Sequence, residues 1–139
     1  MPAPATALIV DDEPHARTYV RLLLKEIGIE TCWEAGDGAQ ALALFEQHQP
    51  ELVLLDVNLR MMTGLQVLQQ LKAVSADLPV VMLSSESAIK TVHEAVRLGA
   101  MAYILKHSPK EEALESLRGV VAALADDGDE AAEDEPAGS

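Results

Sequence analysis

Short apolar runs alternate with amphipathic stretches along most of the chain. Continuous apolar tetrads lie at residues 7–10, 52–55 and 80–83, and such runs are typical of strands that are buried on both faces of a parallel sheet. The runs at residues 30–34 and 101–105 mix polar and apolar side chains. We therefore expect these two strands to lie nearer the edges of the sheet.

A stretch with apolar residues three or four positions apart follows each predicted strand, and this spacing places the apolar side chains on one face of a helix. These positions are Ala16, Val20, Leu23, Leu24 and Ile27; Ala41, Leu42 and Phe45; Leu65, Leu68 and Leu71; Ile89, Val92 and Val96; and Leu114, Leu117, Val121 and Leu124. The alternation predicts an α/β fold of the (βα)5 type. Right-handed crossovers then place helices on both faces of a doubly wound, five-stranded parallel sheet.

Local signals for helix ends agree with this periodicity. Residues 37–40, 63–66 and 108–111 each match the capping box that begins a helix. Gly28 and Gly99 lie where two of the helices would end. The helix boundaries are thus predicted independently of the apolar pattern.

The charge of the chain restricts its partners. Its 139 residues include 23 Asp and Glu against 10 Lys and Arg, which gives a formal net charge of -13. Nucleic acids and anionic membranes carry the same sign, so we expect no direct binding to either. No apolar run approaches the roughly 20 residues needed to cross a bilayer, and the single cysteine, Cys32, leaves no internal disulfide. These features predict a soluble, cytoplasmic protein.

More than half of the net charge lies near the C-terminus. Residues 126–135 carry seven acids and no base, and no large apolar residue follows Leu124. Such a segment buries too little apolar area to offset the entropy that ordering would cost. We therefore expect a folded domain over residues 6–124 and a disordered acidic tail over residues 125–139.

Polar side chains follow four of the predicted strands at the point where each strand ends. They are Asp11, Asp12 and Glu13; Asp56; Ser84 and Ser85; and Lys106. Because the carboxyl ends of parallel strands share one edge of the sheet, these side chains are predicted to meet there. Acidic residues at strand ends also cap helices, which is the simpler interpretation for Asp11 and Asp12 taken alone.

The combination of groups at this edge indicates phosphoryl chemistry. Clustered carboxylates repel one another and are costly to bury unpaired, which favours a hard divalent cation such as Mg²⁺. Lys106 can hold a phosphoryl oxygen or pair with Asp56, and the Ser84 hydroxyl can donate to a phosphoryl group. Because an aspartate can attack phosphorus, the site is predicted to accept and hold a phosphoryl group.

These residues resemble those of the receiver domain of two-component response regulators. The resemblance covers about residues 6–124, and it rests on matches in the expected order: Asp11, Asp12, Asp56, Gly64, Ser84, Tyr103 and Lys106. It implies a flavodoxin-like sheet with strand order 2-1-3-4-5. It also implies a signalling function within a phosphorelay, without enzymatic activity beyond the domain's own phosphorylation and autodephosphorylation.

The resemblance further implies how phosphate is taken up. Asp56 would accept a phosphoryl group from a phosphohistidine of a sensor histidine kinase or a phosphotransfer protein. Mg²⁺ would be ligated by Asp12, Asp56 and the backbone carbonyl of Asn58, with Asp11 acting through water.

The resemblance also implies roles for Ser84, Lys106 and Tyr103 once Asp56 carries the phosphoryl group. Ser84 and Lys106 would hold the phosphoryl oxygens. Tyr103 would turn inward as Ser84 moves, which would alter the face made by the fourth helix, the fifth strand and the fifth helix, where a downstream protein target would bind. As a simpler alternative, Tyr103 is a half-buried strand aromatic with its hydroxyl in water.

Two positions depart from the family pattern. Arg60 lies where receivers usually have a proline, four residues after Asp56, and His107 follows Lys106 where they usually have a proline with a cis peptide bond. A cis bond before a residue other than proline costs about 2.5 to 4 kcal/mol. We therefore predict a trans bond between Lys106 and His107.

Two polar residues are expected to tune the lifetime of the phosphorylated state. Asn58 and Glu86 lie two positions beyond Asp56 and Ser84 respectively, where a side chain can orient or obstruct the water that attacks an acyl phosphate. This pairing resembles that of chemotaxis regulators in the family, which implies rapid loss of phosphate. In the simpler alternative, both are solvated loop residues.

Two other functions remain open from the sequence. The first is an interaction module of the same fold that works without phosphorylation, which binding of acetyl phosphate or beryllofluoride would contradict. The second is a phosphohydrolase with an aspartyl-phosphate intermediate, to which Asp56-Val57-Asn58 bears a faint likeness. Asn58 cannot serve as the acid or base that such chemistry needs, so only turnover of phosphomonoesters would support that alternative.

Overall fold

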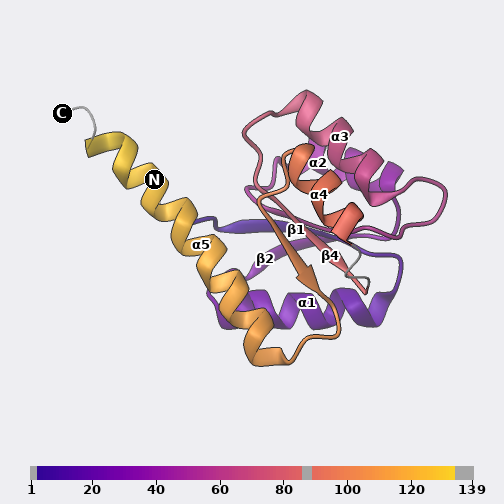
Figure 1. The fold of residues 1–139 in the computed structure, drawn as a ribbon, viewed down its shortest axis with the longest axis horizontal. Coiled ribbons are helices and arrows are strands. Elements are labelled where there is room, and N and C mark those ends of the chain that lie inside the picture. Colours follow the sequence, from indigo (N-terminus) through magenta and orange to yellow (C-terminus); the bar gives the residue numbers. More distant parts are fainter. Residues whose placement is uncertain (1–2, 86–88, 134–139) are drawn as a thin grey trace.

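A computed structural model describes residues 3–85 and 89–133 of the chain, with side chains described up to residue 125. Within these residues, five parallel strands form one sheet in the order β2-β1-β3-β4-β5 (Figure 1). The strands are β1 (Thr6–Val10), β2 (Thr31–Ala35), β3 (Val53–Asp56), β4 (Val80–Ser84) and β5 (Ala102–Leu105). The predicted (βα)5 fold and its strand order are confirmed.

Helices cover both faces of the sheet. They are α1 (Pro14–Glu26), α2 (Gly38–His48), α3 (Gly64–Val74), α4 (Ile89–Arg97) and α5 (Lys110–Glu133). One face is covered by α1 and α5, and the other by α2, α3 and α4, as Figure 1 shows. The apolar core is accordingly divided into two layers, one on each side of the sheet.

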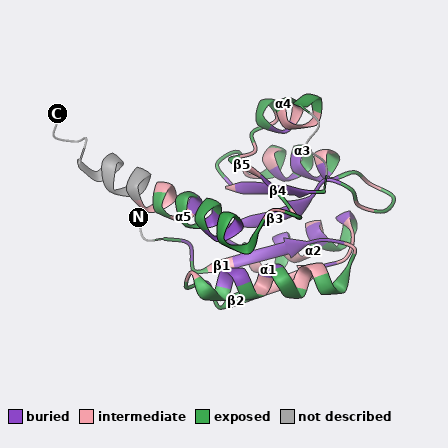
Figure 2. Ribbon diagram, turned by 60° about the horizontal axis from the view of Figure 1, so that its bottom comes forward, coloured by how far each residue is buried: buried purple, intermediate pink, exposed green. Residues whose placement is uncertain are grey.

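The three central strands explain the apolar tetrads. Successive strand residues point to opposite faces: Ile9 belongs to the layer beneath α1 and α5, and its neighbours Leu8 and Val10 to the layer beneath α2, α3 and α4. Both layers are filled, so β1, β3 and β4 are buried almost throughout (Figure 2). The mixed segments form β2 and β5, which lie at the two edges of the sheet as expected.

Of the three predicted capping boxes, one is complete and a second is half formed. At α3, the Thr63 hydroxyl accepts from Gln66 N and the Gln66 side chain accepts from Thr63 N, which completes a capping box. At α2, the Asp37 carboxylate accepts from the backbone N–H three residues on. The prediction for residues 108–111 is wrong, because Ser108 Oγ donates to the carbonyl of Leu105 and α5 begins only at Lys110.

The structure differs from the expected disorder of residues 125–139 over part of that segment. The backbone of α5 stays helical to Glu133. Ala125, Ala131 and Ala132 favour a helix, and extending a helix that already packs on a core costs far less than starting one. Residues 134–139 lie outside the described residues.

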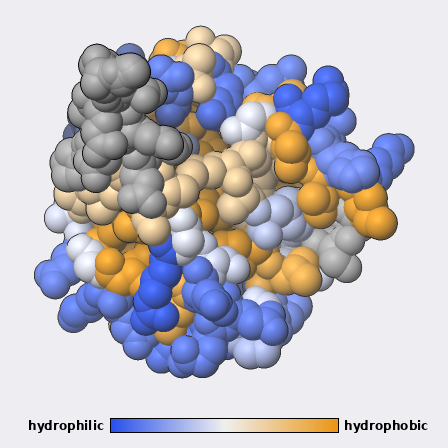
Figure 3. Space-filling view, turned by 60° about the vertical axis from the view of Figure 1, so that its left-hand side comes forward, coloured by the Kyte–Doolittle hydropathy of each residue, from blue (hydrophilic) through white to orange (hydrophobic). Residues whose placement is uncertain are grey.

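Some apolar surface remains exposed. On the face shown in Figure 3, apolar surface lies among hydrophilic regions. The large exposed apolar side chains of the described residues are Tyr19, Leu22, Met61, Val74, Ile89, Val96, Met101 and Leu105. None of the helices within residues 3–85 and 89–133 combines the length and apolar character needed to span a membrane.

Candidate functional site

The first pair of candidate residues lies in the loop between β1 and α1. Asp11 follows the last residue of β1, and its N–H donates to the carbonyl of Ala35 at 3.0 Å, which extends the pairing with β2 by one residue. The Asp11 side chain is fully buried and accepts from Glu13 N at 3.0 Å. Asp12 is partly exposed. The loop therefore presents one carboxylate inside the molecule and the next at its surface.

Asp56 is the last residue of β3 and is buried. The loop beyond it is tightly packed, since Gly64 N donates to the carbonyl of Val57 at 2.8 Å. A Cβ atom on Gly64 would lie 2.1 Å from the carbonyl oxygen of Asp56, a distance that no side chain tolerates. Glycine at position 64 is thus required for α3 to begin directly beside the candidate phosphorylated residue.

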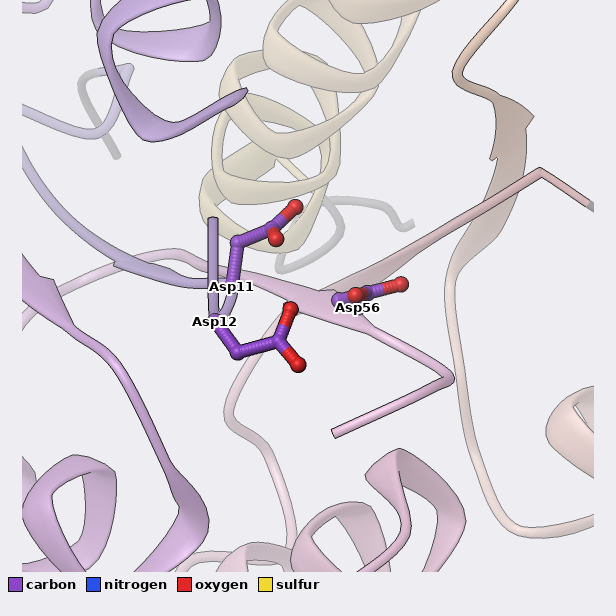
Figure 4. Close-up of side chains that lie close together, drawn as sticks. All are labelled: Asp11, Asp12 and Asp56. Atoms are coloured by element: carbon purple, nitrogen blue, oxygen red, sulfur yellow. The ribbon is translucent and has the colours of Figure 1, made fainter. Parts of the chain in front are cut away.

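The three carboxylates gather at the carboxyl edge of the sheet. Figure 4 shows Asp11 and Asp12 on the loop after β1, beside Asp56 at the end of β3. One carboxylate oxygen from each residue lies within 4.8 Å of the other two. Burial, together with the negative charge of Asp11, raises the pKa of Asp56 to about 6 even though Lys106 opposes the shift. At neutral pH Asp56 is therefore still mostly ionised, but at a cost in free energy.

Lys106 supplies the positive charge of the site. Its Nζ lies 2.7 Å from Asp11 Oδ2 and 3.2 Å from Asp56 Oδ2. Burial alone would lower the pKa of Lys106, but bonding to Asp11 and the charges of Asp56 and Asp11 outweigh it and raise this pKa. Lys106 is therefore charged and bridges the two buried carboxylates. The pairing with Asp56 was predicted from the sequence, whereas the shorter contact with Asp11 was not.

The donor set fits a hard divalent cation. Three carboxylates face the Lys106 ammonium and, at the exposed side, the Arg60 guanidinium, so negative charge remains in excess. The carboxylate oxygens are close enough to reach a single small ion. Asp11 Oδ2 is buried and makes no well-aligned hydrogen bond among the described residues, so the 2.7 Å contact with Lys106 acts as an ion pair. Asp12 is 22% exposed, which gives an ion a route from solvent.

Two further predicted residues lie on the last two strands. Ser84 is fully buried at the end of β4, and its carbonyl accepts from Lys106 N at 2.8 Å, so the sheet places the serine beside the lysine. Tyr103 pairs in register with Met82 and packs, partly buried, against the core layer beneath α2, α3 and α4. The sheet therefore places the backbone of Ser84 beside that of Lys106, and it leaves Tyr103 partly buried against the core layer to which α4 contributes.

The residues predicted to tune phosphate lifetime are placed only in part. Asn58 N donates to Asp56 Oδ1 at 3.3 Å, and the Asn58 side chain is exposed. Glu86 lies outside the described residues. The backbone of Asn58 thus contacts the candidate acceptor, and the role of its side chain in phosphate lifetime stays a prediction.

The two departures from the family pattern have different outcomes. The described residues contain no cis peptide bond, so the predicted trans bond between Lys106 and His107 is confirmed. Arg60, in the loop after β3, points back to the site, with its Nε 3.7 Å from Asp12 Oδ2.

Sequence reasoning also missed Arg17. Its Nη1 donates to the Asp11 carbonyl at 2.6 Å. Neither the contact of Arg17 nor that of Arg60 has a sequence signal of its own, because both depend on how a long side chain is oriented.

With this geometry established, comparison with known proteins identifies the class. The family model described as the response regulator receiver domain matches residues 7–118. The chain belongs to this family, whose function is phosphorylation-based signalling.

Individual relatives agree with this assignment. Chemotaxis protein CheY of Bacillus subtilis is 32% identical over 110 residues, covering 79% of this chain and 92% of CheY. The nitrate/nitrite response regulator protein NarP of Escherichia coli is 37% identical over 116 residues, which cover 83% of this chain but 54% of NarP. The chain thus spans about half the length of NarP and of other relatives named as regulators.

Solved structures show the same fold. Chemotaxis protein CheY4 of Vibrio cholerae has a TM-score of 0.77 and 29% identity, covering 85% of this chain and 99% of that chain. The receiver domain of NtrX from Brucella abortus has a TM-score of 0.76 and 33% identity, covering 84% of this chain and 98% of that one.

Proposed function

We propose that this receiver domain, over residues 6–124, takes a phosphoryl group onto Asp56 from a phosphohistidine of a sensor histidine kinase or a phosphotransfer protein. The observation that supports this proposal most strongly is the contact of Lys106 with both Asp11 and Asp56, beside the partly exposed Asp12. A helix-capping role for the acidic residues does not account for a lysine held between two of them.

The side chains of this chain supply the nucleophile and the groups that hold the phosphoryl oxygens. An oxygen of Asp56 attacks the phosphorus, so an oxygen–phosphorus bond forms as the phosphorus–nitrogen bond to the partner imidazole breaks, and the imidazole takes a proton from water. Lys106 and the Ser84 hydroxyl hold the phosphoryl oxygens. The domain carries out only its own phosphorylation and later autodephosphorylation.

Mg²⁺ is the proposed cofactor. Asp12, Asp56 and the backbone carbonyl of Asn58 would hold it, with Asp11 acting through water. When bound, the ion neutralises carboxylate repulsion and the charge on the phosphoryl oxygens.

A protein target is the proposed output. Helix α4 and strand β5 pack together, and they carry the exposed Ile89, Val96 and Leu105. Tyr103 lies on the same strand, so its inward turn as Ser84 moves would reshape this face. From the acidic charge we propose that the chain makes no direct contact with nucleic acid or membrane. The single cysteine and the lack of a long apolar run favour a cytoplasmic location.

Labelling of Asp56 tests the proposal. Wild-type protein is incubated with acetyl phosphate and Mg²⁺, alongside the Asp56→Asn variant and Asp77→Asn, which changes an exposed aspartate in the loop before β4. We expect phosphate on the wild type and on Asp77→Asn but not on Asp56→Asn, because an amide is isosteric but not nucleophilic. Undiminished labelling of Asp56→Asn would refute the site. If the wild type bound neither acetyl phosphate nor beryllofluoride, the interaction module that works unphosphorylated would be favoured.

A further inference from the structure

Arg17 connects three parts of the fold. It lies on α1, and its largely buried side chain turns back toward β1. Its Nη1 donates to the carbonyl oxygen of Asp11 at 2.6 Å, and its Nε donates to Glu34 Oε1 on β2 at 3.0 Å. One guanidinium thereby ties the loop that carries Asp11 and Asp12 to the neighbouring edge strand.

Glu34 is held in turn by a second arginine. Arg21, one turn further along α1, donates from Nε to Glu34 Oε2 at 2.8 Å and from Nη2 to the carbonyl of Cys32. Burial acts to raise the pKa of Glu34, but hydrogen bonds and charges of Arg21 and Arg17 lower it below its ordinary value. Glu34 is therefore ionised at neutral pH and accepts from both guanidinium groups at once.

An anchor on the carboxylate loop matters because Asp11, Asp12 and Asp56 repel one another when no divalent cation is bound. Arg17 meets this need at the backbone of Asp11 and leaves the side-chain oxygens open. Lys106 opposes the same repulsion differently, since it lies on the carboxylates themselves.

We propose that Arg17, oriented by Glu34, is a positioning residue for the divalent cation. It fixes the Asp11 backbone and so sets the affinity of the loop carboxylates, Asp11 and Asp12, for the ion. This inference rests on the proposed function, because it concerns the same cation site. Groups that orient metal ligands typically change metal affinity by about 10-fold to 100-fold when they are removed. Arg17 touches a neighbouring carbonyl rather than a ligand side chain, so the low end of that range applies.

Two matched variants separate positioning from general stability. Arg17 and Arg21 lie on the same helix, and Arg17→Gln and Arg21→Gln each remove one guanidinium that donates to Glu34. Only Arg17→Gln also removes the hydrogen bond to the Asp11 carbonyl. Mg²⁺ affinity of the full chain is measured by calorimetric titration, with the unfolding midpoint of each metal-free variant recorded beside it. We expect the Mg²⁺ dissociation constant to rise about tenfold in Arg17→Gln and to stay within about twofold of wild type in Arg21→Gln.

Kinetics gives a second readout that loss of stability would not produce. In phosphorylation by acetyl phosphate, the Mg²⁺ concentration for half-maximal rate should rise in Arg17→Gln, while the rate at saturating Mg²⁺ stays near that of wild type. If Arg17→Gln does not fold, Arg17→Lys and Arg21→Lys replace the pair. A lysine keeps the charge but cannot bond Glu34 and the Asp11 carbonyl in the fixed geometry of a guanidinium, so Arg17→Lys should still bind Mg²⁺ more weakly than Arg21→Lys.

The outcomes are distinct. Equal Mg²⁺ affinities in the two members of either pair, with wild type binding normally, would overturn the positioning role and leave the proposed function intact. A wild-type chain that binds no Mg²⁺ would overturn the cation site itself, and the positioning role with it.

Discussion

Arg60 Nε lies 3.7 Å from Asp12 Oδ2, on the side of the site that faces solvent. The proline usual at this position in receivers has no charge, so here the chain carries its own cation beside a proposed Mg²⁺ ligand. Arg60 is 78% exposed, and an ion pair at such a position contributes little, typically below about 1 kcal/mol. We therefore expect Arg60 to weaken Mg²⁺ binding at Asp12 by a small but measurable amount.

Removing Arg60 should tighten Mg²⁺ binding. In Arg60→Ala, Asp12 no longer has a competing partner, so we expect the Mg²⁺ dissociation constant to fall by about twofold to threefold, with the larger effect at low salt. Arg97→Ala, which removes another exposed arginine on α4, is the control. Calorimetric titration at two salt concentrations measures both, and weaker binding in Arg60→Ala would mean that Arg60 assists the ion.

Mg²⁺ should stabilise the fold through Asp12. A ligand selective for the native state raises the unfolding midpoint, and Asp12→Ala removes a proposed ligand without emptying a buried position. We expect the Mg²⁺-dependent rise in the midpoint to be strongly reduced in Asp12→Ala and unchanged in Asp77→Ala. An identical rise in wild type and Asp12→Ala would show that the ion binds elsewhere.

Protonation of Asp56 should contribute stability to the metal-free protein as pH falls. Because the pKa of Asp56 is raised to about 6, the folded chain binds this proton more tightly than the unfolded chain does. Folding is therefore favoured as pH falls through 6, by on the order of 1 kcal/mol between about pH 7 and pH 5. Urea unfolding of wild type and Asp56→Asn at both pH values isolates this contribution from that of the histidines. A pH response of equal size in both proteins would assign it to other groups.

Loss of Lys106 should have its largest effect at neutral pH. Lys106→Ala leaves Asp11 and Asp56 buried together without a counter-charge, which is destabilising. The penalty should shrink as pH falls, because protonation of Asp56 relieves the repulsion, and it should shrink when Mg²⁺ is added. Unfolding of Lys106→Ala with an equal penalty at every pH would show that the lysine matters for packing alone.

The phosphorylated state is predicted to be short-lived. Asn58 and Glu86 are both polar, and Asn58 lies beside Asp56, so water can be oriented for attack on the acyl phosphate. We expect the double variant Asn58→Met with Glu86→Leu to lose phosphate more slowly, as followed after removal of acetyl phosphate. A wild-type half-life of hours, or no slowing in the variant, would contradict this role.

The fold was predictable because it depends on periodic burial. Tetrads such as residues 52–55 are apolar throughout since both faces of β3 are covered, and β2 and β5 are mixed since each is an edge strand. The site was predictable for a related reason, because the topology brings the residues after the strands to one edge.

The sequence did not reveal the features that depend on which of several possible local contacts forms. Arg17 and Arg60 reach the site through side-chain directions that spacing does not encode. Ser108 bonds to the turn behind it rather than capping α5. The continuation of α5 reflects helix propagation, which an argument from buried area overlooks.

Because of the position of Lys106, the ability of the site to accept phosphate depends on an edge strand of the sheet. The lysine directly follows β5, whose strand neighbour is β4 alone. Edge strands with partly exposed residues open locally at a lower free energy than central ones. Brief fraying of β5 would withdraw the ammonium from Asp11 and Asp56 while β1 and β3 stay folded, so amide hydrogen exchange at β5 would report how often the acceptor is left without its cation.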